Sequence, residues 1–158
     1  MPVLRCWKLA LRCKIFKIQA MQDNPNELEK YSVRSSDVIY TVFADAVKIG
    51  NDYLVYLWGG EAPHIGAVAA AQPRPSLVDP AQTSASSSVL TYVGHKEDVV
   101  VKQVAEELSS ALNENVVVTA GIHWDNIEKT GIEKVVAGCR EVTEALIEVL
   151  GKHNEETK

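Results

Sequence analysis

Two amphipathic helical patterns, separated by one strand-like run, constrain most strongly what this chain can fold into. In residues 97–112 apolar side chains recur at helical spacing, and charged side chains occupy most of the remaining positions. A second pattern begins at Thr130, with Glu133 three residues later as in a capping box, and Gly151 is its expected end. Because each helix has a single apolar stripe, both helices must pack on another layer of structure.

Strand-like runs supply that layer. Two runs rich in β-branched and aromatic residues, 38–49 and 53–58, flank the turn sequence Gly50-Asn51-Asp52 and predict a hairpin. Shorter apolar runs predict three further strands, at residues 65–71, 89–93 and 116–120. Alanines in the first of these runs indicate that another element packs closely against it. The order of the elements predicts an α+β fold, in which a mainly antiparallel sheet is packed by two amphipathic helices.

Two segments have the composition of connections. Residues 72–88 are rich in proline, serine and alanine, and we expect a long loop there, either a mobile lid over a ligand or a plain connection. Residues 22–36 are polar and contain Asn24-Pro25-Asn26, which is typical of a linker or flexible arm. The expected organisation is a basic start and polar linker at 1–36, a single domain at 37–153 and a polar tail at 154–158.

The first twenty residues differ in charge from the rest of the chain. They carry five lysine or arginine residues and no acid, whereas all 158 residues together have a formal net charge of −5. Basic residues interrupt the apolar ones too often for a secretory signal. Three interpretations stay open: an added strand or helix, which we favour, a weak amphipathic surface segment, or sequence upstream of a true start at Met21.

The composition argues against several classes of function. A net charge of −5 is unsuited to nucleic-acid binding, and no apolar run approaches the roughly 20 residues of a membrane span. Three cysteines without C-x-x-C spacing indicate neither a disulfide framework nor a thiolate zinc site, and a reducing, cytoplasmic location fits them best. Cys139 lies on the apolar stripe of the second helix, so we expect a small hydrophobic side chain with no catalytic role.

Three histidines, His64, His95 and His123, each lie beside glycine in a turn-like sequence that follows a strand-like run. Glycine lets the backbone adopt a positive φ or approach a ligand closely, and the adjacent imidazole is then presented to that ligand. We therefore expect the three loops to assemble one site. The fourth histidine, His153, lies in a polar stretch, and we expect it to face solvent.

Several chemistries suit this set of histidines. With Asp125 they could form a transition-metal site, although ligands about thirty residues apart match no recognised zinc signature and a single histidine is by default structural. Lys96, next to His95 at the start of a helix, suits a phosphate or is simply an exposed lysine. Trp58 and Trp124 can stack on a planar ring or pack in the core. With no nucleophile elbow, dinucleotide fingerprint or Walker loop in the sequence, the residues favour a flat, phosphorylated ligand.

The order of the motifs resembles a known family. His64-Ile65-Gly66-Ala67-Val68-Ala69, the Thr83-Ser84 region, Gly94-His95-Lys96-Glu97-Asp98, and Gly121-Ile122-His123 with Asp125-Asn126 are similar to the small D subunit of gallate decarboxylase, a prenylated-flavin chaperone. The resemblance covers residues 52–136. It implies a fold like that of proteasome assembly chaperones, usually as a homodimer. It also implies a non-catalytic protein that binds prenylated flavin mononucleotide (FMN) and carries it from the flavin prenyltransferase to a UbiD-type decarboxylase of aromatic or related unsaturated acids.

The same resemblance implies which residues line the flavin site. Carried over position by position, they are His64, Gly66, Thr83, Ser84, Gly94, His95, Lys96, Gly121, His123, Asp125 and Asn126. Two other functions stay open. One is a small metal-dependent hydrolase or lyase that uses His64, His95 and His123, and the other is a subunit assembly chaperone with no ligand.

Overall fold

The computed structural model describes residues 14–16 and 28–156, with side chains from residue 28 to residue 153. Most of the basic start, Cys6, Cys13 and the question of a start at Met21 lie outside the described residues. Within the start, Lys14–Phe16 form a short strand, β1, as the interpretation that we favoured expects for this segment.

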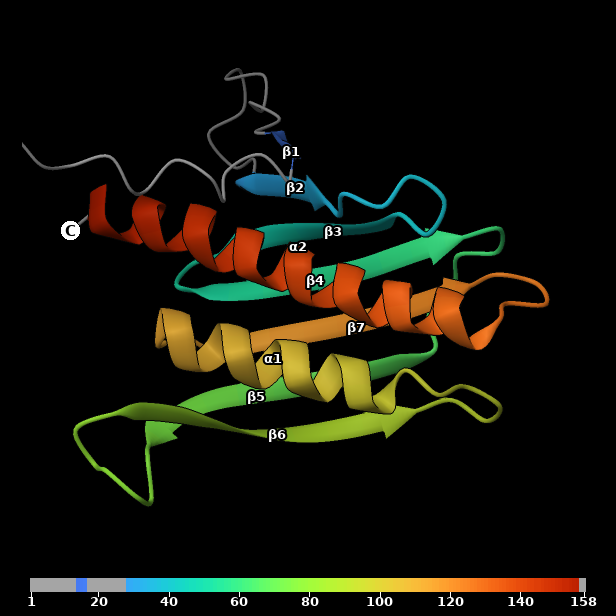
Figure 1. Cartoon of the computed structure of the whole chain (residues 1–158). Coiled ribbons are helices and arrows are strands. Elements are labelled where there is room, and N and C mark those ends of the chain that lie inside the picture. The colour runs from blue at the N-terminus through green and yellow to red at the C-terminus, as the bar shows by residue number, and fades with distance from the viewer. Residues whose placement is uncertain (1–13, 17–27, 157–158) are drawn as a thin grey trace, which may run out of the picture.

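The described strands form one mixed sheet, which Figure 1 shows in front view with the strands labelled. Its other strands are β2 (Lys30–Arg34), β3 (Val42–Ile49), β4 (Asp52–Gly60), β5 (Ala67–Pro75), β6 (Thr83–Thr91) and β7 (Val116–His123). They lie in the order β1-β2-β3-β4-β7-β5-β6. Only the pairing of β4 with β7 is parallel, and the other neighbouring strands run antiparallel.

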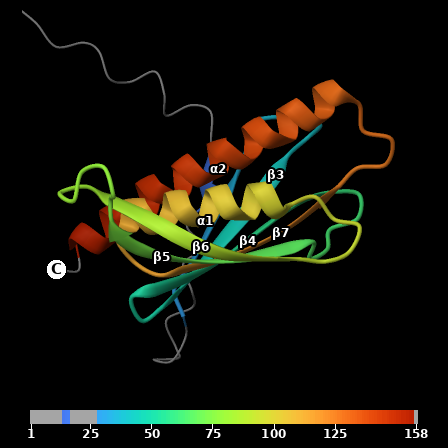
Figure 2. The same cartoon turned by 90° about the horizontal axis from the view of Figure 1, so that it is seen from below.

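Both helices, α1 (Asp98–Leu112) and α2 (Lys129–Glu156), lie on the same face of the sheet (Figure 2). Helix α1 packs on β5, β6 and β7, and α2 packs on β2 and β3. Side chains alternate along the central strands, so that Tyr53, Val55 and Leu57 of β4 are buried under the helices. Alanines at 67, 69 and 71 of β5 let α1 lie close to that strand. The expected α+β fold, a mainly antiparallel sheet packed by two helices, is confirmed.

The expectation of a long loop at residues 72–88 is wrong. Strand β5 continues to Pro75 and β6 begins at Thr83, so the two form a long hairpin with a connection of only seven residues, 76–82. The prolines of this segment are compatible with a strand because β5 pairs with β7 only as far as Ala71. Beyond that point β5 has a single neighbour, and a strand edge is where a sheet tolerates proline.

Three other expectations are corrected at the ends of the domain. Strand β2 lies within the segment 22–36 that we expected to be a linker, and its Tyr31 and Val33 are buried in the core. Helix α2 does not end at Gly151 but continues to Glu156, because a helical glycine costs only about 1 kcal/mol and need not stop the chain. His153 is not a solvent-facing tail residue, since its Nε2 lies 3.0 Å from Glu29 Oε2 and its side chain is only 18% exposed.

The second face of the sheet carries aromatic and charged side chains. Phe43 and Tyr56 each stack with Trp58, with ring centroids 5.4 and 5.5 Å away. Beside them, Asp45 pairs with Lys30 at 2.8 Å and accepts a hydrogen bond from the Tyr56 hydroxyl. Burial opposes ionisation of Asp45, but the hydrogen bonds that it accepts outweigh burial and lower its pKa. Within the described residues neither helix covers this face, and neither has the length and hydropathy to cross a membrane.

Removal of a core side chain from α2 should show how far the helix–sheet interface determines stability. Leu146 is fully buried, and Leu146→Ala should lower the free energy of unfolding by about 2–5 kcal/mol in urea denaturation. Val78, in the connection between β5 and β6, is 95% exposed, so Val78→Ala is the control and should change that free energy by less than about 0.5 kcal/mol. Equal effects of the two substitutions would contradict the packing described here.

Candidate functional site

The sheet topology brings the three histidine loops to one edge. Because β4 and β7 are parallel, both end at this edge. Strand β5 runs antiparallel to β7 and begins there, and β6 ends there before the chain enters α1. His64 lies in the β4–β5 connection, His95 in the β6–α1 connection, and His123 at the end of β7. Histidines that are far apart in the sequence therefore become neighbours.

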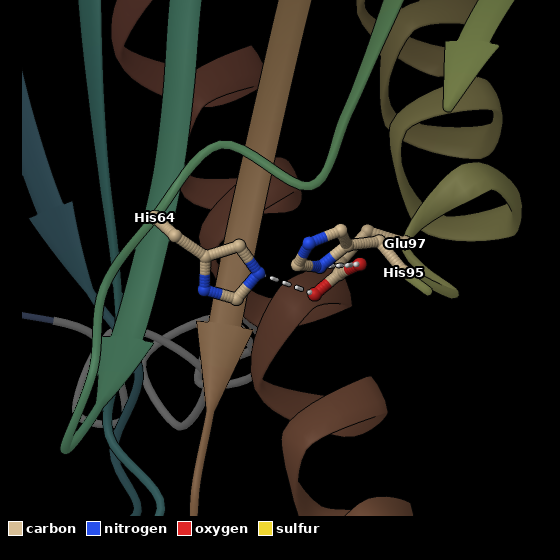
Figure 3. Close-up of side chains that lie close together, drawn as sticks. All are labelled: His64, His95 and Glu97. Carbon is tan, nitrogen blue, oxygen red and sulfur yellow. Dashed lines mark ion pairs between the residues drawn. The ribbon is translucent and has the colours of Figure 1, made fainter. Parts of the chain in front are cut away.

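Two of the rings and one carboxylate form a compact cluster, drawn in Figure 3. The ring centroids of His64 and His95 are 4.5 Å apart, and that of His123 lies 6.3 Å from His64. The carboxylate of Glu97 lies beside both of these rings, with Oε1 3.3 Å from His64 Nε2 and Oε2 3.8 Å from His95 Nδ1. The side chains of His64, His95 and Glu97 are 25%, 35% and 14% exposed, so the cluster is sheltered and still reachable from solvent.

Glu97 is the central residue that the sequence did not single out as a site residue. Helical spacing placed it on the solvent side of the first helix, but it immediately precedes α1 and turns back toward the sheet edge. Its carboxylate accepts hydrogen bonds from the backbone N–H groups of Lys96 and Ile122. It also occupies the space left by Gly66, where an added Cβ would lie 2.5 Å from Glu97 Oε2. A glutamate directly after Gly-His-Lys was the available signal.

Glycines allow the β4–β5 connection to cross the end of β7. A Cβ at Gly121 would lie 1.9 Å from the carbonyl oxygen of His64, which no side chain can accommodate without a shift of the backbone. Gly60 has φ +85° and faces the carbonyl of His123 in the same way. The close crossing of two backbones fixes the position of His64 over the edge.

The hydrogen bonds of His64 determine which of its nitrogens faces Glu97. Its Nδ1 lies 3.0 Å from the carbonyl oxygen of Ala62, which can only accept, so Nδ1 carries a proton. In the neutral ring Nε2 is then an acceptor, and this buried atom has no hydrogen-bond partner. Nε2 and the Glu97 oxygen are two acceptors 3.3 Å apart, so a proton or a metal ion is needed to hold them together.

His123 belongs to a second, more exposed group. Its Nε2 donates a hydrogen bond to Asp125 Oδ1 at 2.9 Å, and the backbone N–H of Asp125 donates to Glu61 Oε2 at 3.0 Å. Asn126 follows with φ 54° in the turn that leads to α2. Lys96 is exposed close to Glu97, and Gly94, with φ +88°, has open space around it. The structure therefore brings nine of the expected site residues to the same edge.

Thr83 and Ser84 are not brought to this edge. They pair with Pro75 and Arg74 at the far end of the β5–β6 hairpin. A cavity of about 520 Å³ lies at that opposite edge of the sheet. Its lining is mixed, and the polar residues in it are Asp52, Gln72, Ser86, Ser87, Ser88 and Asn115. The eleven expected site residues thus divide between two ends of the sheet. Nine lie at the edge that carries His64, His95 and His123, the histidine edge, and Thr83 and Ser84 lie toward the opposite edge, the serine edge.

The two tryptophans near the histidine edge have packing roles. Trp124 meets the ring of Tyr40 edge-on at 5.4 Å, and its ring also lies over Gly59. Trp58 is held in the aromatic stack on the second face of the sheet. Neither ring is left as an open stacking platform at the histidine cluster.

The fold and the site together define a class of protein. It is an α+β domain with a partly exposed cluster of histidine and glutamate side chains at one edge of the sheet. Residues 37–151 match the family model described as the prenylated flavin chaperone LpdD-like domain, and the chain belongs to this family. The resemblance seen in the sequence motifs is confirmed by this match.

The other comparisons add less. A solved structure described as a novel chaperone complex for yeast 20S proteasome assembly is 9% identical to this chain. It covers 72% of this chain and 98% of its own, with a TM-score of 0.41, a likeness too low to define the fold by itself. The search of curated proteins finds no match.

Substitution of Gly121 should test the backbone crossing that holds His64. Gly121→Ala places a Cβ against the His64 carbonyl and should lower the free energy of unfolding by about 1–3 kcal/mol, the usual cost of overpacking. Gly151→Ala is the matched control, because no atom lies within 4 Å of its Cβ and alanine favours a helix. It should stabilise the protein by roughly 0.5–1 kcal/mol. A neutral Gly121→Ala in urea denaturation would count against the crossing.

Proposed function

We propose that this protein is a non-catalytic carrier that binds prenylated FMN and delivers it from the flavin prenyltransferase to a UbiD-type decarboxylase. The observation that carries the proposal is the family match over residues 37–151, because that segment contains all three histidine loops. The prenylated flavin supplies the reactive ring system to the decarboxylase. The residues of the carrier need only bind the cofactor, shelter it and release it.

The histidine edge offers groups that suit a phosphorylated ligand. His95 and His123 are partly exposed there and can donate from a ring nitrogen, and Lys96 adds an exposed ammonium group. Glu97 and Asp125 lie among these donors and repel an anion. The fit is therefore that of a site with modest affinity for a phosphate, which is compatible with later release. If Thr83 and Ser84 also bound the flavin, they would do so in a second region, away from the histidine edge.

A carrier needs no nucleophile, and the described cysteine is a poor one. Cys139 is 3% exposed in the core, and burial raises the pKa of its thiol to about 12. Its sulfur therefore stays protonated at neutral pH. This supports the expectation that Cys139 packs as a small hydrophobic side chain.

The carrier is proposed to act as a homodimer through the second face of the sheet. Half-buried aromatic rings line that face, and Val117, near the start of β7, is 38% exposed. A stable interface buries about 800 Å² on each partner, which a sheet of this size can supply. Burial of this face would place the two helices on the outside of the dimer.

Flavin binding should depend on the histidine edge and on the prenyl group. In anaerobic titrations monitored by absorbance, reduced prenylated FMN should bind the wild-type chain and ordinary FMN should bind more weakly. His95→Ala and His123→Ala should each weaken binding roughly tenfold or more, because a hydrogen bond to a charged group contributes about 1.5–3 kcal/mol. Ser87→Ala, which changes the cavity at the opposite edge, is the control.

Three outcomes would contradict parts of this proposal. Absence of flavin binding would remove the carrier function. Loss of binding in Ser87→Ala alone would move the site to the serine edge. Hydrolase or lyase turnover that requires a metal, measured without any decarboxylase, would favour the metal-dependent enzyme that the sequence left open.

A substitution on the second face of the sheet should change the association state, and a substitution on the outside of a helix should not. Sedimentation equilibrium at micromolar concentration should give the mass of a dimer for the wild type. Val117→Lys should shift the mass toward the monomer, because it places a charge in an apolar interface. Glu144→Lys, on the exposed side of α2, should leave the dimer intact. A wild-type monomer at this concentration would rule out the proposed dimer.

A further inference from the structure

We propose that His64, His95 and Glu97 form a binding site for a divalent first-row transition metal ion. Each of the three side chains offers a ligand atom, and these atoms lie within 4.8 Å of one another. The set differs from the three histidines that the sequence left open only as an alternative metal site. Glu97 takes the place of His123, whose Nε2 is already bound to Asp125.

The distances in the cluster match those between ligands on a shared ion. Two ligand atoms each about 2.05 Å from a tetrahedral ion lie about 3.3 Å apart. The distance from His64 Nε2 to Glu97 Oε1 is 3.3 Å. His95 Nδ1 is 3.8 Å from the other carboxylate oxygen and completes the set.

Backbone groups next to the cluster hold two of the three proposed ligands, His64 and Glu97, by hydrogen bonds, as is usual for the ligands of metal sites. The backbone carbonyl of Ala62 accepts a hydrogen bond from His64 Nδ1, which directs the free electron pair of Nε2 toward the cluster. The backbone N–H groups of Lys96 and Ile122 hold the Glu97 carboxylate. Apart from its 3.3 Å contact with Glu97, the buried Nε2 of His64 has no hydrogen-bond partner, and this is the observation that points most directly to a role as a metal ligand.

One metal ion can engage both rings and the carboxylate together. The ring centroids of His64 and His95 are 4.5 Å apart, and both rings approach the single carboxylate of Glu97. A divalent ion there would use a lone pair of each ring and balance the charge of the carboxylate. Two nitrogen ligands and one carboxylate favour ions such as Zn²⁺ or Co²⁺ over Mg²⁺ or Ca²⁺, which prefer oxygen. Three protein ligands leave a coordination position open to water or to a phosphate oxygen.

The test uses metal ions alone and the full chain without a histidine tag. After treatment with a chelator, the protein is titrated with Co²⁺ while the visible absorption of the bound ion is recorded, and Zn²⁺ is then added as a competitor. We expect about one ion per chain and a spectrum of low coordination number. His95→Ala and Glu97→Gln should each weaken binding at least about tenfold, as loss of a ligand requires.

His123→Ala is the matched control, since this ring lies at the same edge but outside the cluster, and it should bind Co²⁺ within about twofold of wild type. Thermal unfolding of each metal-free variant establishes that it is folded. For a folded variant, unchanged binding in Glu97→Gln would overturn the site. Equal weakening in His123→Ala would overturn the choice of ligands, and absence of saturable wild-type binding below about 100 μM would overturn the proposal as a whole. None of these results depends on flavin binding, so the carrier function and the metal site can fail separately.

Discussion

The parallel pairing of β4 with β7 is the constraint on which the rest of the structure depends. Parallel strands cannot be joined by a tight turn, so the chain must cross over between them, and here the crossover contains β5, β6 and α1. The register pairs Tyr53 with Val116 and Gly60 with His123, so both strands end together. This pairing places the loops of His64 and His123 at one edge, and the antiparallel pairings of β5 with β7 and with β6 bring the His95 loop to the same edge.

Backbone segments approach one another closely at that edge, and this close approach positions its polar side chains. Gly121 lets the His64 backbone pass directly over β7, and Gly66 makes room for the carboxylate of Glu97. Without side chains at these two positions, an imidazole and a carboxylate are held in contact while both remain partly exposed. A rigid backbone crossing under accessible polar groups suits a site that must bind a ligand and later release it.

The proposed carrier function and the proposed metal site would meet at this edge. Acidic groups among the histidines make the edge a weak receptor for a phosphate by itself. A divalent ion held by His64, His95 and Glu97 would reverse the local charge and leave a coordination position open toward solvent. The second sheet face, with its stacked aromatic rings, is distinct from this edge and serves the proposed association of two copies.

The sequence by itself determined the types of elements, the fold class, the family and the three histidine loops, because periodicity and turn residues report local conformation and burial. It placed the connection at 72–88 wrongly, since proline at a strand edge is decided by which neighbours the strand has. Only the tertiary structure drew Glu97 into the cluster, turned His123 toward Asp125 and separated Thr83 from the histidines. The physical reason is that strand register and backbone crossings set distances between residues that local patterns cannot encode.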